Sequence, residues 1–168
     1  MACGTVTRLQ DGNMANWTIR RADEDDAGQL AQCIDQAYSA YKSRISDLPP
    51  VSEGLPDEIR DNLVWVAVLG GGPEGRPEDN ILGGMVLVLQ DDHLLLANVA
   101  VRPDAAGMGL GRAFLDLAES ETKQRGLAKL RLSTHCEMPE NVRLYQHLGW
   151  HETGRSGNKV TMEKSLML

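Results

Sequence analysis

The sequence predicts a single α/β domain built around a mixed sheet. Three strand-like runs follow one another between residues 63 and 101, and strands in direct succession favour antiparallel pairing. The strand, helix and strand that come next imply a parallel crossover. The chain has 168 residues, of which 42% are hydrophobic and 24% are charged. It is therefore long enough to bury one core, and no linker divides it.

The N-terminal part of the chain predicts one strand followed by two helices. Residues 17–22 alternate weakly between apolar and polar side chains, as a strand does. Asp23 is placed to cap a helix whose first turn is acidic, and apolar residues recur at helical spacing from residue 27 to residue 45. A proline at its start predicts a short second helix over residues 56–62.

Three strands are expected next. Residues 63–69 and 81–89 are apolar runs separated by a loop rich in Gly and Pro, which predicts an extended hairpin connection. Residues 93–101 form the third run. Pro103 closes this strand. It also forces extended geometry on Arg102, the residue before it.

The C-terminal part alternates helices and strands. A helical stripe over residues 107–125 ends in Arg-Gly, and residues 127–134 alternate as a strand. A proline begins the next helix, at 139–148, and a glycine ends it. The remaining residues predict a closing hairpin, with strands at 150–155 and 159–166.

Composition and charge restrict the function classes. The net charge is −7, whereas a nucleic-acid-binding face is basic, so we expect no nucleic-acid partner. Apolar runs are too short to cross a bilayer and no secretory signal is visible, so we expect a cytoplasmic protein with no membrane partner. Residues 1–13 lack periodicity and are expected to be a flexible extension before a single domain at 14–168. Three cysteines without paired spacing predict neither a disulfide framework nor a metal site.

The most informative segment runs from residue 99 to residue 112. It leads from a predicted strand into a loop with alternate glycines, Gly107, Gly109 and Gly111, and a helix begins inside that loop. Backbone N–H groups can approach an anion closely there, and the helix dipole adds partial positive charge. A phosphate or pyrophosphate is the natural ligand, and the alternative is that the glycines only allow a tight turn. The spacing fits neither the dinucleotide fingerprint nor a P-loop.

A second motif begins at Asn141 and includes Tyr145, 34 residues after Gly111. Together the two segments resemble the GNAT superfamily, the acyl-CoA-dependent N-acyltransferases. Val101 to Gly111 is similar to the family element V-x-P-x-x-(R/Q)-G-x-G-x-G. Asn141 to Trp150 is similar to its element N-x-x-(A)-x-x-L-Y-x-x-x-G-(F/W). The order of elements over residues 17–166 also matches.

The resemblance implies a GNAT-like fold, with a mixed, mostly antiparallel sheet of six or seven strands and helices on both faces. It also implies acetyl-CoA as co-substrate. The backbone of Val99–Val101 would pair with the pantetheine arm and polarise the thioester, and the glycine loop would hold the pyrophosphate. Ala106 stands where the family usually has Arg or Gln. The loss of that side chain would weaken cofactor binding. The residues assigned to the cofactor in this way are Val99, Ala100, Val101, Ala106, Gly107, Met108, Gly109, Leu110, Gly111, Arg112, Asn141 and Tyr145.

Two residues are expected to take part in catalysis. Tyr145 resembles the family tyrosine near the thioester sulfur, which assists the departing thiolate, and the alternative is a core tyrosine. Asn98 lies on the strand where many relatives carry a glutamate base. Its amide cannot usefully accept a proton, but it can orient a water. Other candidate bases, each more simply explained as structural or solvated, are Asp92, His93, His135 and Glu137.

The acceptor is expected to be a small-molecule amine. In the family the acceptor lies between the first helices and the closing hairpin, and those helices bring Tyr38 and Tyr41 as acceptor-binding residues. Acidic residues nearby favour a cationic amine, namely Glu53, Asp57, Glu58 and Asp61. Two alternatives stay open: a CoA-binding regulatory or catalytically weak module, and a protein N-terminal or lysine acetyltransferase. The sequence is also compatible with a homodimer.

Overall fold

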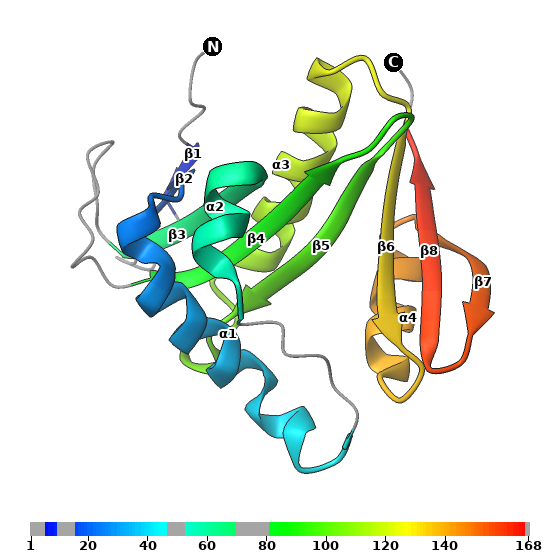
Figure 1. Ribbon diagram of the computed structural model, residues 1–168, viewed down its shortest axis with the longest axis horizontal. Helices are drawn as coiled ribbons and strands as arrows, with labels where there is room; N and C mark the ends of the chain where they lie inside the picture. The colour runs from blue at the N-terminus through cyan, green and yellow to red at the C-terminus, as the bar shows by residue number, and fades with distance from the viewer. Residues whose placement is uncertain (1–5, 10–15, 47–52, 70–80, 167–168) are drawn as a thin grey trace. The chain divides into compact units, whose positions relative to one another are not determined.

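A computed structural model describes residues 6–9, 16–46, 53–69 and 81–166 of the chain (Figure 1). The chain divides into two compact units. The first comprises residues 1–86 and 98–114, and the second comprises residues 87–97 and 115–168. Two strands and one helix run from one unit into the other. The predicted connection at 70–80 lies outside the described residues.

The first unit contains the strands β1 (Val6–Leu9), β2 (Asn16–Arg21) and β3 (Leu63–Leu69), with parts of β4 (Ile81–Leu89) and β5 (Leu94–Val101). These strands are hydrogen-bonded in this order. The β1–β2 and β2–β3 pairs are antiparallel, as expected for strands in succession. The bounds of β3 and β4 are those that the apolar runs predict.

Strand β1 lies within the segment for which the sequence predicts no element. It pairs with β2, with Val6 opposite Ile19 and Leu9 opposite Asn16. A four-residue strand is too short to show a period of two, which is why pattern analysis misses it. The structure thus adds one strand, at residues 6–9, that the sequence pattern does not predict.

Two adjacent glycines in β4 allow helices to pack on opposite faces of the sheet in the first unit. A Cβ on Gly83 would lie 2.8 Å from the Ala100 carbonyl oxygen and 3.1 Å from Phe114 in helix α3 (Leu110–Gln124). A Cβ on Gly84 would overlap Leu30 in helix α1 (Ala27–Lys42). Because successive strand residues face opposite sides, α1 and the start of α3 cover different faces. The prediction of helices on both faces is confirmed for this unit.

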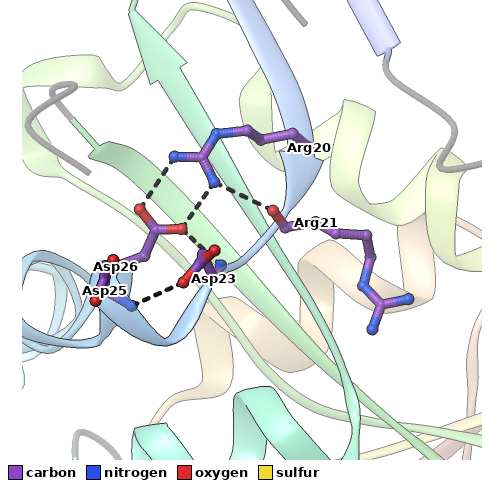
Figure 2. A network of polar contacts seen from close by, with 5 residues as sticks. All are labelled: Arg20, Arg21, Asp23, Asp25 and Asp26. Carbon is purple, nitrogen blue, oxygen red and sulfur yellow. Dashed lines mark hydrogen bonds and ion pairs between the residues drawn. The ribbon is translucent and has the colours of Figure 1, made fainter. Parts of the chain in front are cut away.

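A buried ion pair joins the end of β2 to the start of α1 (Figure 2). Arg20 contacts Asp26 through two hydrogen bonds, Nη1 to Oδ2 at 2.7 Å and Nη2 to Oδ1 at 3.0 Å. The Asp26 carboxylate also accepts the backbone N–H of Asp23 at 2.7 Å, and the Asp23 side chain caps the short helix Glu24–Asp26. Asp26 is completely buried, so these bonds offset the cost of removing its charge from water.

The second unit forms a smaller part of the sheet. Besides parts of β4, β5 and α3, it contains β6 (Lys129–His135), α4 (Pro139–His147), β7 (His151–Ser156) and β8 (Lys159–Ser165). β5 and β6 are parallel, whereas β6–β8 and β7–β8 are antiparallel. Alternate residues of β6 and β8 are buried, such as Leu130 and Met162. The predicted mixed sheet is confirmed, and none of the helices described is long and apolar enough to span a membrane.

Replacing Asp26 by Asn should destabilise the protein strongly. The substitution leaves Arg20 buried without its opposite charge, which costs about 3–5 kcal/mol for a buried pair. Urea unfolding at pH 7 measures the loss. Asp57→Asn is the matched control, because the Asp57–Arg60 pair is exposed and its loss should leave the unfolding midpoint unchanged. Equal midpoints for wild type and Asp26→Asn would contradict this account of the ion pair.

Candidate functional site

The glycine loop connects β5 to α3 within the first unit. A short 3-10 turn, Pro103–Ala105, follows β5, and α3 begins at Leu110. Gly107 and Gly109 have φ angles of +84° and +82°, in the left-handed region where a side chain is strained. These two glycines are therefore required by the backbone conformation. The predicted tight turn is present.

The loop contains backbone N–H groups that have no acceptor in the described part of the protein. Among the described residues, the amides of Gly107 and Gly109 donate no hydrogen bond to the protein. The first amides of α3 follow them, and such groups have no carbonyl one turn earlier. A Cβ added at Gly107 or Gly111 would meet nothing within 4 Å. The loop thus offers donors without a protein acceptor at a helix N-terminus, an arrangement that fits a pyrophosphate.

The strand before the loop keeps one edge open. β5 pairs with β6 only over Leu94–Leu96, although β5 continues to Val101. On that edge, Val99–Val101 has no strand partner among the residues that the structure describes. An extended ligand with amide groups could add to such an edge as a further strand.

The other loop residues have individual roles in the structure. Ala106 is exposed, and its N–H lies 3.3 Å from the Pro103 carbonyl. Arg112 is exposed in the first turn of α3. The Met108 carbonyl accepts a hydrogen bond from the indole Nε1 of Trp17 at 3.1 Å. Sequence analysis did not identify Trp17, because no local pattern connects residues 91 positions apart.

The structure brings together Asn98 and the two tyrosines predicted to contact the acceptor. The Tyr38 hydroxyl donates to Asn98 Oδ1 at 3.4 Å. The rings of Tyr38 and Tyr41 lie 6.1 Å apart, and the guanidinium of Arg44 lies 5.1 Å from the Tyr41 ring. Burial raises the pKa of Tyr38, and the neighbouring Tyr41 raises it further. Tyr38 therefore stays protonated near neutral pH and acts as a hydrogen-bond donor.

Helix α2 (Leu55–Asp61) carries three acidic residues, Asp57, Glu58 and Asp61, and one arginine, Arg60. Arg60 contacts Asp57 at 2.7 Å and Asp61 at 3.2 Å. The Glu58 carboxylate accepts a hydrogen bond from the Asn62 side chain at 2.6 Å. Arg60 offsets one of these three negative charges, so α2 stays net negative and the potential that it offers a cationic acceptor is only partly reduced.

Asn141 and Tyr145 belong to the second unit, where both lie on α4. The Asn141 side chain contacts the sulfur of Met138 at 3.4 Å, a local contact within the first turn of the helix. Tyr145 is half-buried, and its ring packs edge-to-face on Trp150 with centroids 5.6 Å apart. This contact orients the ring, and the catalytic role of Tyr145 stays a prediction.

The alternative bases are held by local contacts. His93 Nδ1 lies 2.6 Å from the Asp92 carboxylate, and this hydrogen bond lowers the pKa of Asp92. His135 Nδ1 accepts the backbone N–H of Glu137 at 3.1 Å. These contacts give the side chains of Asp92, His93 and His135 a structural role. Among the described residues, no three His, Cys, Asp or Glu side chains are grouped as a metal site requires.

Comparison with known proteins assigns the family. Residues 34–150 match the model of the acetyltransferase (GNAT) family. The chain belongs to the GNAT family. The [ribosomal protein bS18]-alanine N-acetyltransferase of Escherichia coli K12 is 39% identical over 61 residues, which is 36% of this chain and 41% of that protein. The Salmonella typhimurium protein of the same name is 36% identical over the same length. The matched region thus spans about two fifths of the length of these relatives.

Solved structures of GNAT proteins share the fold. The PaiA N-acetyltransferase of Thermoplasma acidophilum, solved with coenzyme A, aligns with a TM-score of 0.74 and 19% identity over 89% of this chain and 98% of that one. The S18-alanine N-acetyltransferase of Escherichia coli aligns with a TM-score of 0.65 and 21% identity over 90% and 95%. At this identity the alignments establish the fold alone, and the predicted GNAT-like fold is confirmed.

Cys33 should resist alkylation in the folded protein. It is buried on α1, and burial raises the pKa of its thiol to about 11, although the nearby charge of Arg102 offsets part of this shift. At pH 8 only about 0.1% of such a thiol is the reactive thiolate. Iodoacetamide followed by peptide mass mapping should show label on the exposed Cys136 and none on Cys33. In urea both should react, and equal labelling of the two in native protein would contradict the placement of Cys33.

Proposed function

We propose that this GNAT protein transfers the acetyl group of acetyl-CoA to an amine, by direct attack of the amine on the thioester. The observation that carries the proposal is the order of groups in the first unit. An open strand edge at Val99–Val101 is followed along the chain by amides of the glycine loop that lack an acceptor among the described residues. Acetyl-CoA has matching groups, the amides of its pantetheine arm and its pyrophosphate. Family membership and the CoA complex of the Thermoplasma acidophilum neighbour support the same ligand.

The chain's own groups have distinct tasks in this proposal. Acetyl-CoA supplies an activated acyl group as a thioester. Backbone N–H groups near Val99 stabilise the negative charge that develops on the carbonyl oxygen during attack. The phenol of Tyr145 donates a hydrogen bond to the departing sulfur, and the Asn141 amide contacts the cofactor arm. Ala106 contributes no side-chain donor, so phosphate binding depends on the loop backbone and on Arg112.

The absence of a carboxylate at residues 94–98 of β5 restricts the acceptor in this proposal. Asn98 and Tyr38 form a neutral pair, so neither removes a proton from the incoming amine. In this proposal the amine loses its proton to water and attacks from its neutral form. At pH 7 roughly 10% of an α-amine with a pKa near 8 is neutral, against roughly 0.04% of a lysine-like amine with a pKa of 10.4. A site without a base therefore favours an α-amine by about two orders of magnitude.

An N-terminal α-amine of a peptide or protein is accordingly the acceptor that we propose. The names of the two relatives specify an alanine of ribosomal protein bS18 as the group that they acetylate, which agrees with this class of acceptor. The guanidinium of Arg44 over the Tyr41 ring disfavours a polycation beside the tyrosines. A cationic small molecule stays the alternative acceptor.

The proposal predicts both the preferred acceptor and its pH profile. Acetylated product is measured by mass spectrometry with acetyl-CoA and three acceptors: a short peptide with a free N-terminal alanine, an N-blocked peptide with one lysine, and spermidine. At pH 7 the alanine peptide should have a kcat/KM at least about 100-fold above that of the lysine peptide. Its rate should level off above about pH 8, while the lysine peptide's rate continues to rise toward about pH 10.

Controls separate the alternatives. Tyr145→Phe should lower kcat by on the order of 10²-fold with every acceptor, because the departing sulfur loses its donor. Faster turnover of spermidine than of the alanine peptide would overturn the proposed acceptor. Tight CoA binding without turnover of any acceptor would instead support a CoA-binding module. Two observations favour that alternative, the exposed Ala106 and the lack of a carboxylate at position 98.

A further inference from the structure

We propose that Trp17 is a positioning residue that holds the glycine loop in the conformation that binds the pyrophosphate of acetyl-CoA. The inference rests on the proposed function, because it takes this loop as the pyrophosphate site. Trp17 lies on β2, and its indole Nε1 donates a hydrogen bond to the Met108 carbonyl at 3.1 Å. The Trp17 residue is completely buried, so its indole is held in place by the core of the first unit.

This hydrogen bond fixes the orientation of one peptide group. The carbonyl of Met108 and the N–H of Gly109 belong to the same planar trans peptide, in which they point in opposite directions. Because the Met108 carbonyl points at Trp17, the Gly109 N–H points away from it. Gly109 donates to no protein acceptor among the described residues, so this N–H is available to a ligand.

The glycines make such a restraint necessary. Gly109 has a φ of +82° and lacks a Cβ, so rotation of the peptide before it meets little steric resistance. Rotation would bring the Met108 carbonyl, with its partial negative charge, to the side where the phosphates bind. The indole of Trp17 opposes this rotation, because the rotated carbonyl would lose its partner. The flexibility of the loop and the restraint from β2 therefore act together.

The chain contains a matched control for this role. Trp65 lies on β3, the strand paired with β2, and it is 2% exposed. Its indole Nε1 is buried without a hydrogen-bond partner among the residues that the structure describes. Replacing Trp65 by Phe removes the same atoms from the core as replacing Trp17 by Phe, but it removes no such hydrogen bond.

The test compares Trp17→Phe with Trp65→Phe in the full chain, using CoA binding by calorimetry and kinetics with the alanine peptide. Trp17→Phe should raise the Kd for CoA and the KM for acetyl-CoA roughly 3- to 10-fold. Its kcat should stay within about 2-fold of wild type, since the reacting groups are untouched. S-acetyl-pantetheine, which has no pyrophosphate, should be used equally well by wild type and Trp17→Phe. Trp65→Phe should leave all these constants unchanged.

Other outcomes overturn the proposal. Equal Kd values for CoA in the two variants, or an equal loss with S-acetyl-pantetheine, would show that Trp17 acts only as a core residue. If Trp17→Phe does not fold, β-(3-benzothienyl)alanine at position 17 keeps the ring shape and replaces the N–H by sulfur, and the same increase in Kd is expected. Failure of the wild-type chain to bind CoA would overturn the proposed function itself, and this inference with it.

Discussion

The first unit depends on the close packing of two helices against adjacent glycines of β4. A side chain at Gly83 would meet the backbone of Ala100 and the ring of Phe114, and one at Gly84 would meet Leu30. At Gly83 the short contact is with backbone, so a side chain there would push the strands apart, whereas at Gly84 it would displace the end of the Leu30 side chain. The same packing determines where the functional segments lie, because α1 carries Tyr38 and α3 begins in the glycine loop.

Polar contacts also fix the positions of α1 and of the glycine loop in the first unit. The Arg20–Asp26 pair fixes the direction in which α1 leaves β2, and further along the same helix Tyr38 reaches Asn98. On the opposite face, Trp17 of β2 reaches the loop before α3 through Met108. One strand, β2, therefore anchors both the helix that bears the tyrosines and the loop that presents its amides. In the proposed mechanism the neutral Tyr38–Asn98 pair leaves proton removal to water, and the proposed preference for an α-amine rests on that step.

Much of the fold is predictable from the sequence, whereas the contacts that complete the site are not. Apolar runs gave the bounds of β3 and β4 because long buried strands have a strong pattern. The four residues of β1 have no such pattern. The spacing of Asp57 and Arg60 could have revealed their pairing, since residues three apart meet on a helix. The bond from Trp17 to Met108 could not be foreseen, because tertiary packing alone brings these residues together.

Amide hydrogen exchange of the glycine loop tests the central claim most directly. In the free protein the unbonded amides of Gly107 and Gly109 should exchange rapidly. Saturating CoA should slow exchange across Gly107–Arg112, because the pyrophosphate accepts these N–H groups. Pantetheine, which lacks the phosphates, should leave the loop unprotected. Unchanged exchange in this loop when CoA is bound would contradict the account, since the pyrophosphate would then lie elsewhere on the protein.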